Sequence, residues 1–420
     1  MGPDVVVDGA HFDSRQILPG QLFVPLLAER DGHDFVPAAA SAGAAAYLTS
    51  REPDAGVAAT AIRVGDTAGS LMDLARWARS RLAVPVVGIT GSVGKTSTKD
   101  LTAAALGATR STWANALSFN NEQGLPVTIL GAPDGVAALV LEMGMRGFGE
   151  IARLCDVGRP EIGVVTAVAG AHTERVGGID GVARAKRELV EALPAGGTAV
   201  LNADDARVAA MGDHTPARVV TYGERGDVRV SGVTLDELAR PSFRVDSPWG
   251  AVDVRLAVSG RHMAWNAAAA LAVAGAVEGR VDAAAEALAA TGVSARRMEI
   301  SRAASGLIVV NDAYNANPDS TIAALDALAA ITAERRVAVL GPMAELDDPV
   351  EAHTRVAAHA AALGIELVAV ATARYGVPPV AATAGEFTPG TLGDLGPGDA
   401  VLVKASNSAG LWLVAERLLT

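Results

Sequence analysis

A glycine-rich turn between an apolar segment and a Lys-Thr pair constrains the fold of this chain more than any other feature. Residues 84–89 are apolar and mostly β-branched, which predicts a buried strand, and residues 97–105 are typical of a helix. In a phosphate-binding loop of this layout, backbone N–H groups at the helix start surround phosphate oxygens, a lysine reaches the β- and γ-phosphates, and a hydroxyl binds Mg²⁺. The strict pattern would place its first glycine at Ile89, but Gly-x-x-Gly-Lys-Thr is intact. The predicted nucleotide-binding residues are Thr90, Gly91, Ser92, Val93, Gly94, Lys95, Thr96 and Ser97.

A phosphate-binding loop indicates a nucleotide but not a reaction, so the residues after the neighbouring strands matter. The apolar segment 137–141 ends at Glu142, and the apolar segment 162–168 leads to His172. Because the carboxyl ends of parallel strands meet at one edge of a sheet, both side chains are expected beside the phosphates. Each of them alone could equally be an ordinary surface or core residue. Together they indicate a metal site.

Lys186, on a helix predicted over residues 181–193, does not suit a simple Mg²⁺ site. An ammonium group repels a cation, and hard cations prefer oxygen ligands, which makes His172 unusual there as well. A lysine that adds CO₂ becomes a carbamate, which is an anionic oxygen ligand. Carbamylation of Lys186 is therefore a hypothesis that reconciles this residue with a metal site.

The last third of the chain alternates between strand-like and helical segments, which predicts a parallel sheet in a Rossmann-like arrangement. Asp312, Tyr314 and Lys404 fall at the carboxyl edge of this sheet. Asp312 could also be an ordinary strand-end acid. Asn317, which precedes Pro318, could be an ordinary helix cap. The strand-like segments are 307–310, 336–340, 366–370 and 400–403, and the helical segments are 320–332, 350–363 and 409–419.

Glu345 and His353 form another titratable pair in this region. Their spacing of eight residues matches no common metal motif, so we expect a helix cap and a surface histidine.

Residues 1–83 are predicted to form a separate small unit. Its two polar clusters, residues 13–15 and 31–35, are typical of turns and helix caps when they are taken alone. The predicted strands are 5–7, 21–24 and 47–49, and the predicted helices are 35–46 and 67–81.

Composition excludes several classes of protein. A length of 420 residues corresponds to about three domains, and a formal net charge of −12 argues against a nucleic-acid-binding protein. A single cysteine, Cys155, suits a reducing compartment. The first residues lack the pattern of a signal peptide, and no apolar run reaches about 18 residues. We therefore expect a cytoplasmic α/β protein without a membrane span.

These motifs resemble the Mur ligase family, the ATP-dependent amide-bond-forming ligases of peptidoglycan precursor synthesis, over nearly the whole chain. The segment 311–320 (NDAYNANPDS) is typical of the branch that adds D-alanyl-D-alanine. Further motifs of the family are residues 13–15, 19–24, 31–35, 88–96, 119–126, 142–146, 149–152, 171–172, 185–189, 260–262 and Asn266. The resemblance implies three α/β domains: an N-terminal domain for the UDP-MurNAc-peptide (1–83), a central ATP-binding P-loop domain with a parallel sheet (84–295), and a C-terminal Rossmann-like domain on the D-Ala-D-Ala side (296–420).

The resemblance also implies roles for individual residues. Lys95, Glu142, His172 and Lys186 would be catalytic. Thr96 and Glu142 would bind one Mg²⁺, while His172 and carbamylated Lys186 would serve a second. Asn266 would contact adenine, and Arg297 and Asp312 would meet ATP from the third domain. The implied residues for the UDP-MurNAc-tripeptide are Ser14, Arg15, His33, Asn120 and Asn121, and those for the dipeptide side are Tyr314, Asn315, Asn317, Ser320 and Lys404.

Two departures from the family pattern concern charged residues. Where the family often has Gly-Arg before the third domain, this chain has Ala295-Arg296-Arg297, so Arg296 competes with Arg297 as the nucleotide contact. Near the C-terminus the family usually has Lys-Gly-Ser-Arg, whereas residues 404–407 are Lys-Ala-Ser-Asn. A charged contact at that point is therefore in doubt.

The implied reaction joins D-alanyl-D-alanine to UDP-MurNAc-tripeptide through an acyl phosphate, with a monomeric enzyme. The alternatives are a sister Mur ligase that adds a single amino acid, a folylpolyglutamate synthetase, a P-loop regulatory NTPase or kinase, and a non-catalytic scaffold. The segment 311–320 argues against the first two. The regulatory NTPase leaves His172, Lys186 and the third unit without a role.

Overall fold

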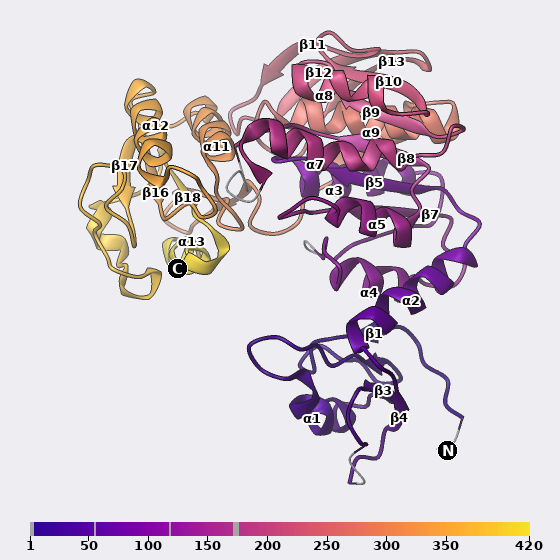
Figure 1. Cartoon of the computed structure of the whole chain (residues 1–420). Helices are drawn as coiled ribbons and strands as arrows, with labels where there is room; N and C mark the ends of the chain where they lie inside the picture. The colour runs from indigo at the N-terminus through magenta and orange to yellow at the C-terminus, as the bar shows by residue number, and fades with distance from the viewer. Residues whose placement is uncertain (1–3, 54–55, 117–118, 171–175) are drawn as a thin grey trace.

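The computed structural model describes residues 4–53, 56–116, 119–170 and 176–420, and within them the chain builds three separate β-sheets (Figure 1). The predicted mixed α/β fold is confirmed. The first sheet lies at one end of the molecule, and the third sheet, with its helices, lies to one side of the central sheet (Figure 1). No described helix is both long enough and apolar enough to cross a bilayer.

The first sheet has four parallel strands in the order β1-β2-β3-β4. Residues 5–7, predicted as a strand, lie outside it and are exposed, with Val6 at 90%. The predicted helix 35–46 is shorter, since the chain turns at Gly43 with a φ of +102° before it enters β3. The elements are β1 (Ala10–His11), β2 (Leu22–Phe23), the 3₁₀ helix η1 (Gly32–Phe35), α1 (Val36–Ser41), β3 (Ala46–Thr49) and β4 (Thr60–Arg63).

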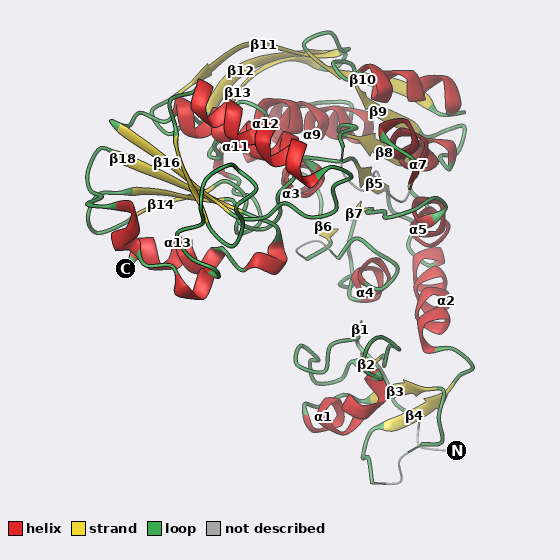
Figure 2. Cartoon of the chain, turned by 60° about the vertical axis from the view of Figure 1, so that its left-hand side comes forward, coloured by secondary structure: helices red, strands yellow, loops and turns green. Residues whose placement is uncertain are grey.

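Helix α2 (Thr67–Ser80) connects the first sheet to the central one (Figure 2). Asp66 caps it, because its carboxylate accepts hydrogen bonds from the N–H groups of Ala68 and Gly69. Leu71 is buried with the apolar side of the first sheet, whereas Ala75, one turn later, is buried in the core of the central sheet. The helix therefore contributes to both cores.

The central sheet has nine strands in the order β13-β12-β11-β10-β9-β8-β5-β7-β6. The predicted parallel arrangement holds from β6 to β11, while β12 and β13 add an antiparallel edge. The strands are β5 (Val86–Thr90), β6 (Thr112–Ala114), β7 (Ala138–Glu142), β8 (Ile162–Val165), β9 (Thr198–Asn202), β10 (Arg218–Gly223), β11 (Val228–Leu235), β12 (Pro241–Ser247) and β13 (Gly250–Arg255).

Helices cover both faces of this sheet, which explains why its inner strands are apolar throughout. Val87 and Ile89 of β5 pack in the same core as α3 and α9, and Val86 packs in the core with α5 and α7. Helix α9 is alanine-rich and almost completely buried against α3. The helices are α3 (Lys95–Gly107), α4 (Gly124–Leu130), α5 (Glu150–Gly158), α7 (Ile179–Glu191), α8 (Ala206–Ala209), the 3₁₀ helix η2 (Ala210–His214), α9 (Met263–Glu278) and α10 (Asp282–Ala290).

The third sheet has the order β14-β15-β18-β16-β17. Its last four strands are parallel as predicted, whereas β14 pairs antiparallel with β15 at the edge. The elements are β14 (Glu299–Arg302), β15 (Ile308–Asn311), α11 (Pro318–Ala330), β16 (Arg335–Leu340), α12 (Pro349–Ala362), β17 (Glu366–Ala369), η3 (Ala384–Glu386), η4 (Pro389–Leu392), β18 (Asp399–Lys404), η5 (Asn407–Ala409) and α13 (Trp412–Leu419).

Candidate active site

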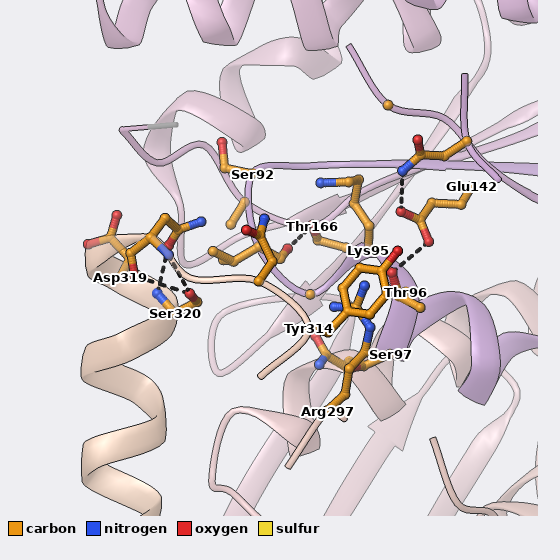
Figure 3. Close-up of a pocket in the computed structure, with 18 of the residues that line it drawn as sticks. Ser92, Lys95, Thr96, Ser97, Glu142, Thr166, Arg297, Tyr314, Asp319 and Ser320 are labelled. Atoms are coloured by element: carbon orange, nitrogen blue, oxygen red, sulfur yellow. Dashed lines mark hydrogen bonds between the residues drawn. The ribbon is translucent and has the colours of Figure 1, made fainter. Parts of the chain in front are cut away.

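A cavity of about 880 Å³ lies where the carboxyl edge of the central sheet faces the third sheet. Its walls include the phosphate loop, the ends of β7 and β10, the first turn of α9, and the segment between β15 and α11. Figure 3 shows Lys95, Thr96 and Glu142 on one side of this space and Asp319 and Ser320 on the other. The cavity thus brings together segments of the central and third units that lie far apart in the sequence.

The phosphate loop occupies the turn from β5, an inner strand of the sheet, into α3. Gly94 caps the helix with a φ of +80°, and the unpaired N–H groups of the first turn begin at Lys95. The Lys95 amine donates to the Gly91 carbonyl oxygen at 2.6 Å. Burial lowers the pKa of Lys95, the negative charge of Glu142 opposes this, and the positive charge of Arg297 adds to it. The loop therefore presents backbone N–H groups and a lysine that suit an anion.

Thr166, just beyond the end of β8, packs against the phosphate loop. Its hydroxyl donates to the Val93 carbonyl oxygen at 2.6 Å, and a Cβ added at Gly91 would lie only 1.8 Å from the same Oγ1. The Ser92 hydroxyl donates to the Ala169 carbonyl oxygen at 3.0 Å. Only glycine fits at position 91, where φ is +152°.

Gly91→Ala is accordingly expected to weaken ATP binding by about tenfold or more, because the loop or Thr166 must move. Gly107→Ala is the matched control, since Gly107 ends the same helix and has no atom within 4 Å of an added Cβ. Calorimetric titration with ATP measures both, and the double variant Gly91→Ala/Thr166→Ala should recover part of the loss. Unchanged ATP affinity in Gly91→Ala would contradict the close contact between position 91 and Thr166.

Glu142 lies at the carboxyl end of β7 and is buried. Its Oε2 accepts a hydrogen bond from the Thr96 hydroxyl at 2.7 Å, and its Oε1 accepts one from the Asn120 amide at 2.7 Å (Figure 3). The Glu142 N–H donates to Asn115 Oδ1 at 2.7 Å. A hydroxyl and a carboxylate side by side provide the hard oxygen ligands that Mg²⁺ prefers. Among the described residues no three His, Cys, Asp or Glu side chains cluster, so these two donors would need phosphate or water oxygens to complete a shell.

Lys186 projects from α7 into the same cavity and is only 2% exposed. Burial holds the pKa of Lys186 well below its usual value of 10.5, and the positive charge of Lys95 lowers it further. Burial therefore favours the neutral form of this amine near the phosphate loop. The predicted partner His172 lies outside the residues that the structure describes.

The first turn of α9 forms another wall of the cavity. A Cβ on Gly94 would lie 2.8 Å from Asn266 Oδ1, so the predicted adenine residue Asn266 touches the phosphate loop itself. Trp265 and His262 also line the cavity, and burial lowers the pKa of His262. The sequence motif of residues 260–262 and Asn266 contained His262 but not Trp265, and only Asn266 was predicted to have a role.

Of the two adjacent arginines at the start of the third domain, Arg297 lines the cavity and Arg296 does not. The Arg297 guanidinium lies 4.2 Å from the centre of the Tyr314 ring and lines the cavity, and its buried Nε has no hydrogen-bond partner among the described residues. Arg296 does not line the cavity, because its guanidinium lies 4.3 Å from the centre of the Trp412 ring. The structure therefore favours Arg297 over Arg296 as the candidate nucleotide contact.

Asp312, which is half-buried, and Lys404, which is buried, form an ion pair at the carboxyl edge of the third sheet. The Lys404 amine lies 2.5 Å from Asp312 Oδ2 and donates to the Asn315 carbonyl oxygen at 2.8 Å. Asp312 Oδ1 accepts from the Met298 N–H at 3.0 Å, one residue after Arg297. The pair therefore fixes the turn that carries Arg297.

Asn317 caps α11, as one reading of the sequence predicted. Its side chain accepts from the Ser320 N–H, and the Ser320 hydroxyl accepts from the Asn317 N–H, which is a capping box. Asn315, Asn317 and Ser320 line the cavity together with Tyr314. Their predicted contact with a dipeptide remains a prediction.

The predicted residues of the first unit do not reach this cavity. The exposed Arg15 side chain is paired with Asp13, whose pKa it holds well below the usual range, and Ser14 lies in the same turn. His33 is buried, with Nδ1 2.6 Å from Asp31 Oδ1, and its Nε2 accepts from the Ser50 N–H. Asn120 and Asn121 do line the cavity, although the Asn121 side chain also accepts from two N–H groups at the start of α4.

Comparison with known families assigns most of the central and third units. The family model of the Mur ligase middle domain matches residues 89–274, and that of the Mur ligase, glutamate ligase domain matches residues 296–407. The chain belongs to the Mur ligase family.

Individual Mur ligases are similar over nearly the whole chain. The UDP-N-acetylmuramoyl-tripeptide–D-alanyl-D-alanine ligase of Mycobacterium tuberculosis is 41% identical, across 99% of this chain and 92% of that protein. The crystal structure of MurF from Acinetobacter baumannii has a TM-score of 0.89 and 26% identity, covering 100% of this chain and 95% of that one. The structure of MurF from Thermotoga maritima in complex with ADP has a TM-score of 0.85 and 25% identity, covering 99% and 98%.

Several cavity residues of this Mur ligase were not predicted as site residues. Thr166, Asn202 and Tyr222 follow or end strands of the central sheet, and Arg261 precedes α9. A search of every strand end for polar residues would have found Thr166 and Asn202. Tyr222 and Trp265 have no local signal, since their position depends on how distant strands and helices pack.

Proposed function

We propose that this Mur ligase joins D-alanyl-D-alanine to UDP-N-acetylmuramoyl-tripeptide with the consumption of ATP. The observation that carries the proposal is the single cavity lined both by the phosphate loop and by residues 312–320 of the third domain. The 41% identity to a ligase of that name over 99% of the chain supports the same substrates. ATP and a UDP-linked peptide are cytoplasmic metabolites, so we place the enzyme in the cytoplasm, and we assign every role to one chain acting as a monomer without nucleic acid.

The proposed chemistry needs positioning and charge more than a protein nucleophile. The carboxylate of the tripeptide takes the γ-phosphoryl group of ATP and ADP leaves. The amine of the dipeptide then attacks the acyl carbon and displaces phosphate, while the amine loses a proton to solvent. The N–H groups of the phosphate loop, Lys95 and Arg297 would hold the phosphates and neutralise the charge that moves with them.

Thr96 and Glu142 would hold a Mg²⁺ ion, and Lys186 as a carbamate would serve a second one. Bound there, the ions would neutralise phosphate oxygens. Asn120 donates to Glu142 and thereby orients its carboxylate toward Thr96. Lys186 must be neutral to add CO₂, and its burial favours that form.

The carbamate can be tested directly because the chain contains only four lysines, Lys95, Lys99, Lys186 and Lys404. In ¹³C NMR with labelled bicarbonate we expect a carbamate signal that disappears in Lys186→Met and persists in Lys404→Met. The signal should grow as the pH rises, because deprotonation favours both the reactive amine and the carbamate. Activity of Lys186→Met should fall about a hundredfold. A signal that survives in Lys186→Met would contradict the assignment.

The ligase reaction is tested by phosphate release from ATP with UDP-MurNAc-tripeptide and Mg²⁺. Release that requires D-alanyl-D-alanine, with a matching mass gain of the UDP-peptide, is the expected result. Release with a single amino acid would indicate a sister ligase. Release without any acceptor would indicate a regulatory NTPase.

A further inference from the structure

We propose that Trp265 forms a rigid aromatic wall for the base of the nucleotide, and that Asp204 holds the indole in place. The inference rests on the ATP site proposed above and adds the residue that receives the base. It also predicts which property of the base Trp265 can recognise.

Trp265 is the largest of the aromatic side chains that line the cavity. Among the described residues of the cavity wall, the aromatic rings are those of Tyr222, His262, Trp265 and Tyr314. Tyr222 is 1% exposed and its hydroxyl lies within hydrogen-bonding distance of the Val165 and Thr166 carbonyl oxygens. A guanidinium lies closer to the Tyr314 ring centre (Arg297, 4.2 Å) than to the Trp265 ring centre (Arg261, 5.9 Å). Trp265 is half-buried. Its nine-atom ring system is the largest planar surface available to a heterocycle.

The position of Trp265 fits a base whose phosphates occupy the loop. Its neighbour Asn266 contacts Gly94 of the loop, so the first turn of α9 lies directly beside the phosphate site. A nucleotide anchored there carries its base to an adjacent wall. The indole lies on this turn.

Asp204, in the turn after β9, fixes the orientation of the indole. The Trp265 Nε1–H donates to Asp204 Oδ2 at 2.7 Å, and the same carboxylate accepts from the Glu224 N–H at 2.7 Å and from Arg225 Nε at 3.2 Å. Gly223 permits this approach, because a Cβ there would lie 2.3 Å from Asp204 Oδ2. These contacts leave the ring little freedom to rotate.

The use of the indole N–H by Asp204 limits what Trp265 can recognise. An indole has one donor and no acceptor, so a ring whose donor is occupied contributes only stacking and apolar contact. Every base has a π-face, and stacking on an aromatic ring therefore tolerates different bases. Trp265 should strengthen the binding of ATP and GTP alike.

Trp265→Ala is expected to weaken ATP and GTP binding about tenfold each in calorimetric titrations. Binding of inorganic tripolyphosphate should be unchanged, which also shows that the phosphate loop is folded. Trp265→Phe should recover most of the affinity. The matched control is Trp77→Ala, since Trp77 is 60% exposed on α2, stacks with Arg81 and does not line the cavity.

The positioning role of Asp204 can be tested separately from the stacking role of Trp265. Asp204→Ala should lower ATP affinity and reduce the quenching of tryptophan fluorescence by bound nucleotide, whereas Asp204→Asn keeps an acceptor and should restore both. Unchanged ATP affinity in Trp265→Ala would overturn the proposal. So would an equal loss for tripolyphosphate, or a loss confined to UDP-MurNAc-tripeptide. Nucleotide binding can be measured without D-alanyl-D-alanine. These results are therefore independent of whether ligation of the dipeptide is observed.

Discussion

Replacement of Lys95 by methionine is expected to lower kcat about a thousandfold, with little change in the binding of UDP-MurNAc-tripeptide. Lys95 is the cation of the phosphate loop and lines the cavity, and its amine lies 2.6 Å from the Gly91 carbonyl oxygen. It can turn from this carbonyl to a phosphate without a change in the backbone. Because negative charge moves during phosphoryl transfer, the loss of this cation should affect the reaction more than ground-state binding.

Steady-state kinetics and calorimetry together test this expectation. Lys95→Arg keeps the charge but changes the geometry, and should recover only a small part of kcat. Binding of the UDP-linked substrate and the thermal midpoint should stay near those of the parent protein, which separates a catalytic loss from unfolding. A loss of less than about tenfold in Lys95→Met would show that Lys95 does not neutralise the transferring group.

Local patterns predicted the strand, the glycine-rich turn and the helix around Lys95 well, because these elements are continuous in sequence. The strand, the two glycines, Lys95 and Thr96 occupy adjacent positions, and the observed β5 and α3 enclose them. Glu142 was also found, since parallel strands end at one edge. Thr166 and the Asp204–Trp265 pair were missed, because each acts through residues more than 60 positions away in the chain.

The prediction for His353 was wrong, because this histidine was expected on the surface and is buried. It is fully buried in α12, its Nε2 accepts from the Met343 N–H, its Nδ1 lies 2.5 Å from the Pro349 carbonyl oxygen, and its ring packs against Tyr375. The helix around it has alanines on several faces, so sequence periodicity could not indicate which face was buried. The residues of the first unit, such as His33, are a different case, since their predicted role depends on a substrate long enough to reach from them to the cavity.

The two adjacent arginines before the third domain allow a matched test of the proposed nucleotide contact. Arg297→Ala is expected to lower kcat about a hundredfold or more, whereas Arg296→Ala should stay within about twofold of the parent. Arg297 lies in the cavity over Tyr314 and close enough to Lys95 for its charge to lower the pKa of that amine. Arg296 has a φ of +63° and stacks on Trp412 outside the cavity.

The reason for the difference is where each guanidinium can act. The Arg297 Nε is buried without a hydrogen-bond acceptor in the described part of the chain, and phosphate oxygens would supply one. Asp312 holds the turn after Arg297 through the Met298 N–H, and Lys404 holds Asp312, so this guanidinium should move as one body with the third domain. Arg297→Lys keeps the charge without the planar fork and should recover activity only in part. Equal losses in the Arg296→Ala and Arg297→Ala variants, measured as kcat and as ATP affinity, would show that the turn as a whole, and not the Arg297 side chain, carries the effect.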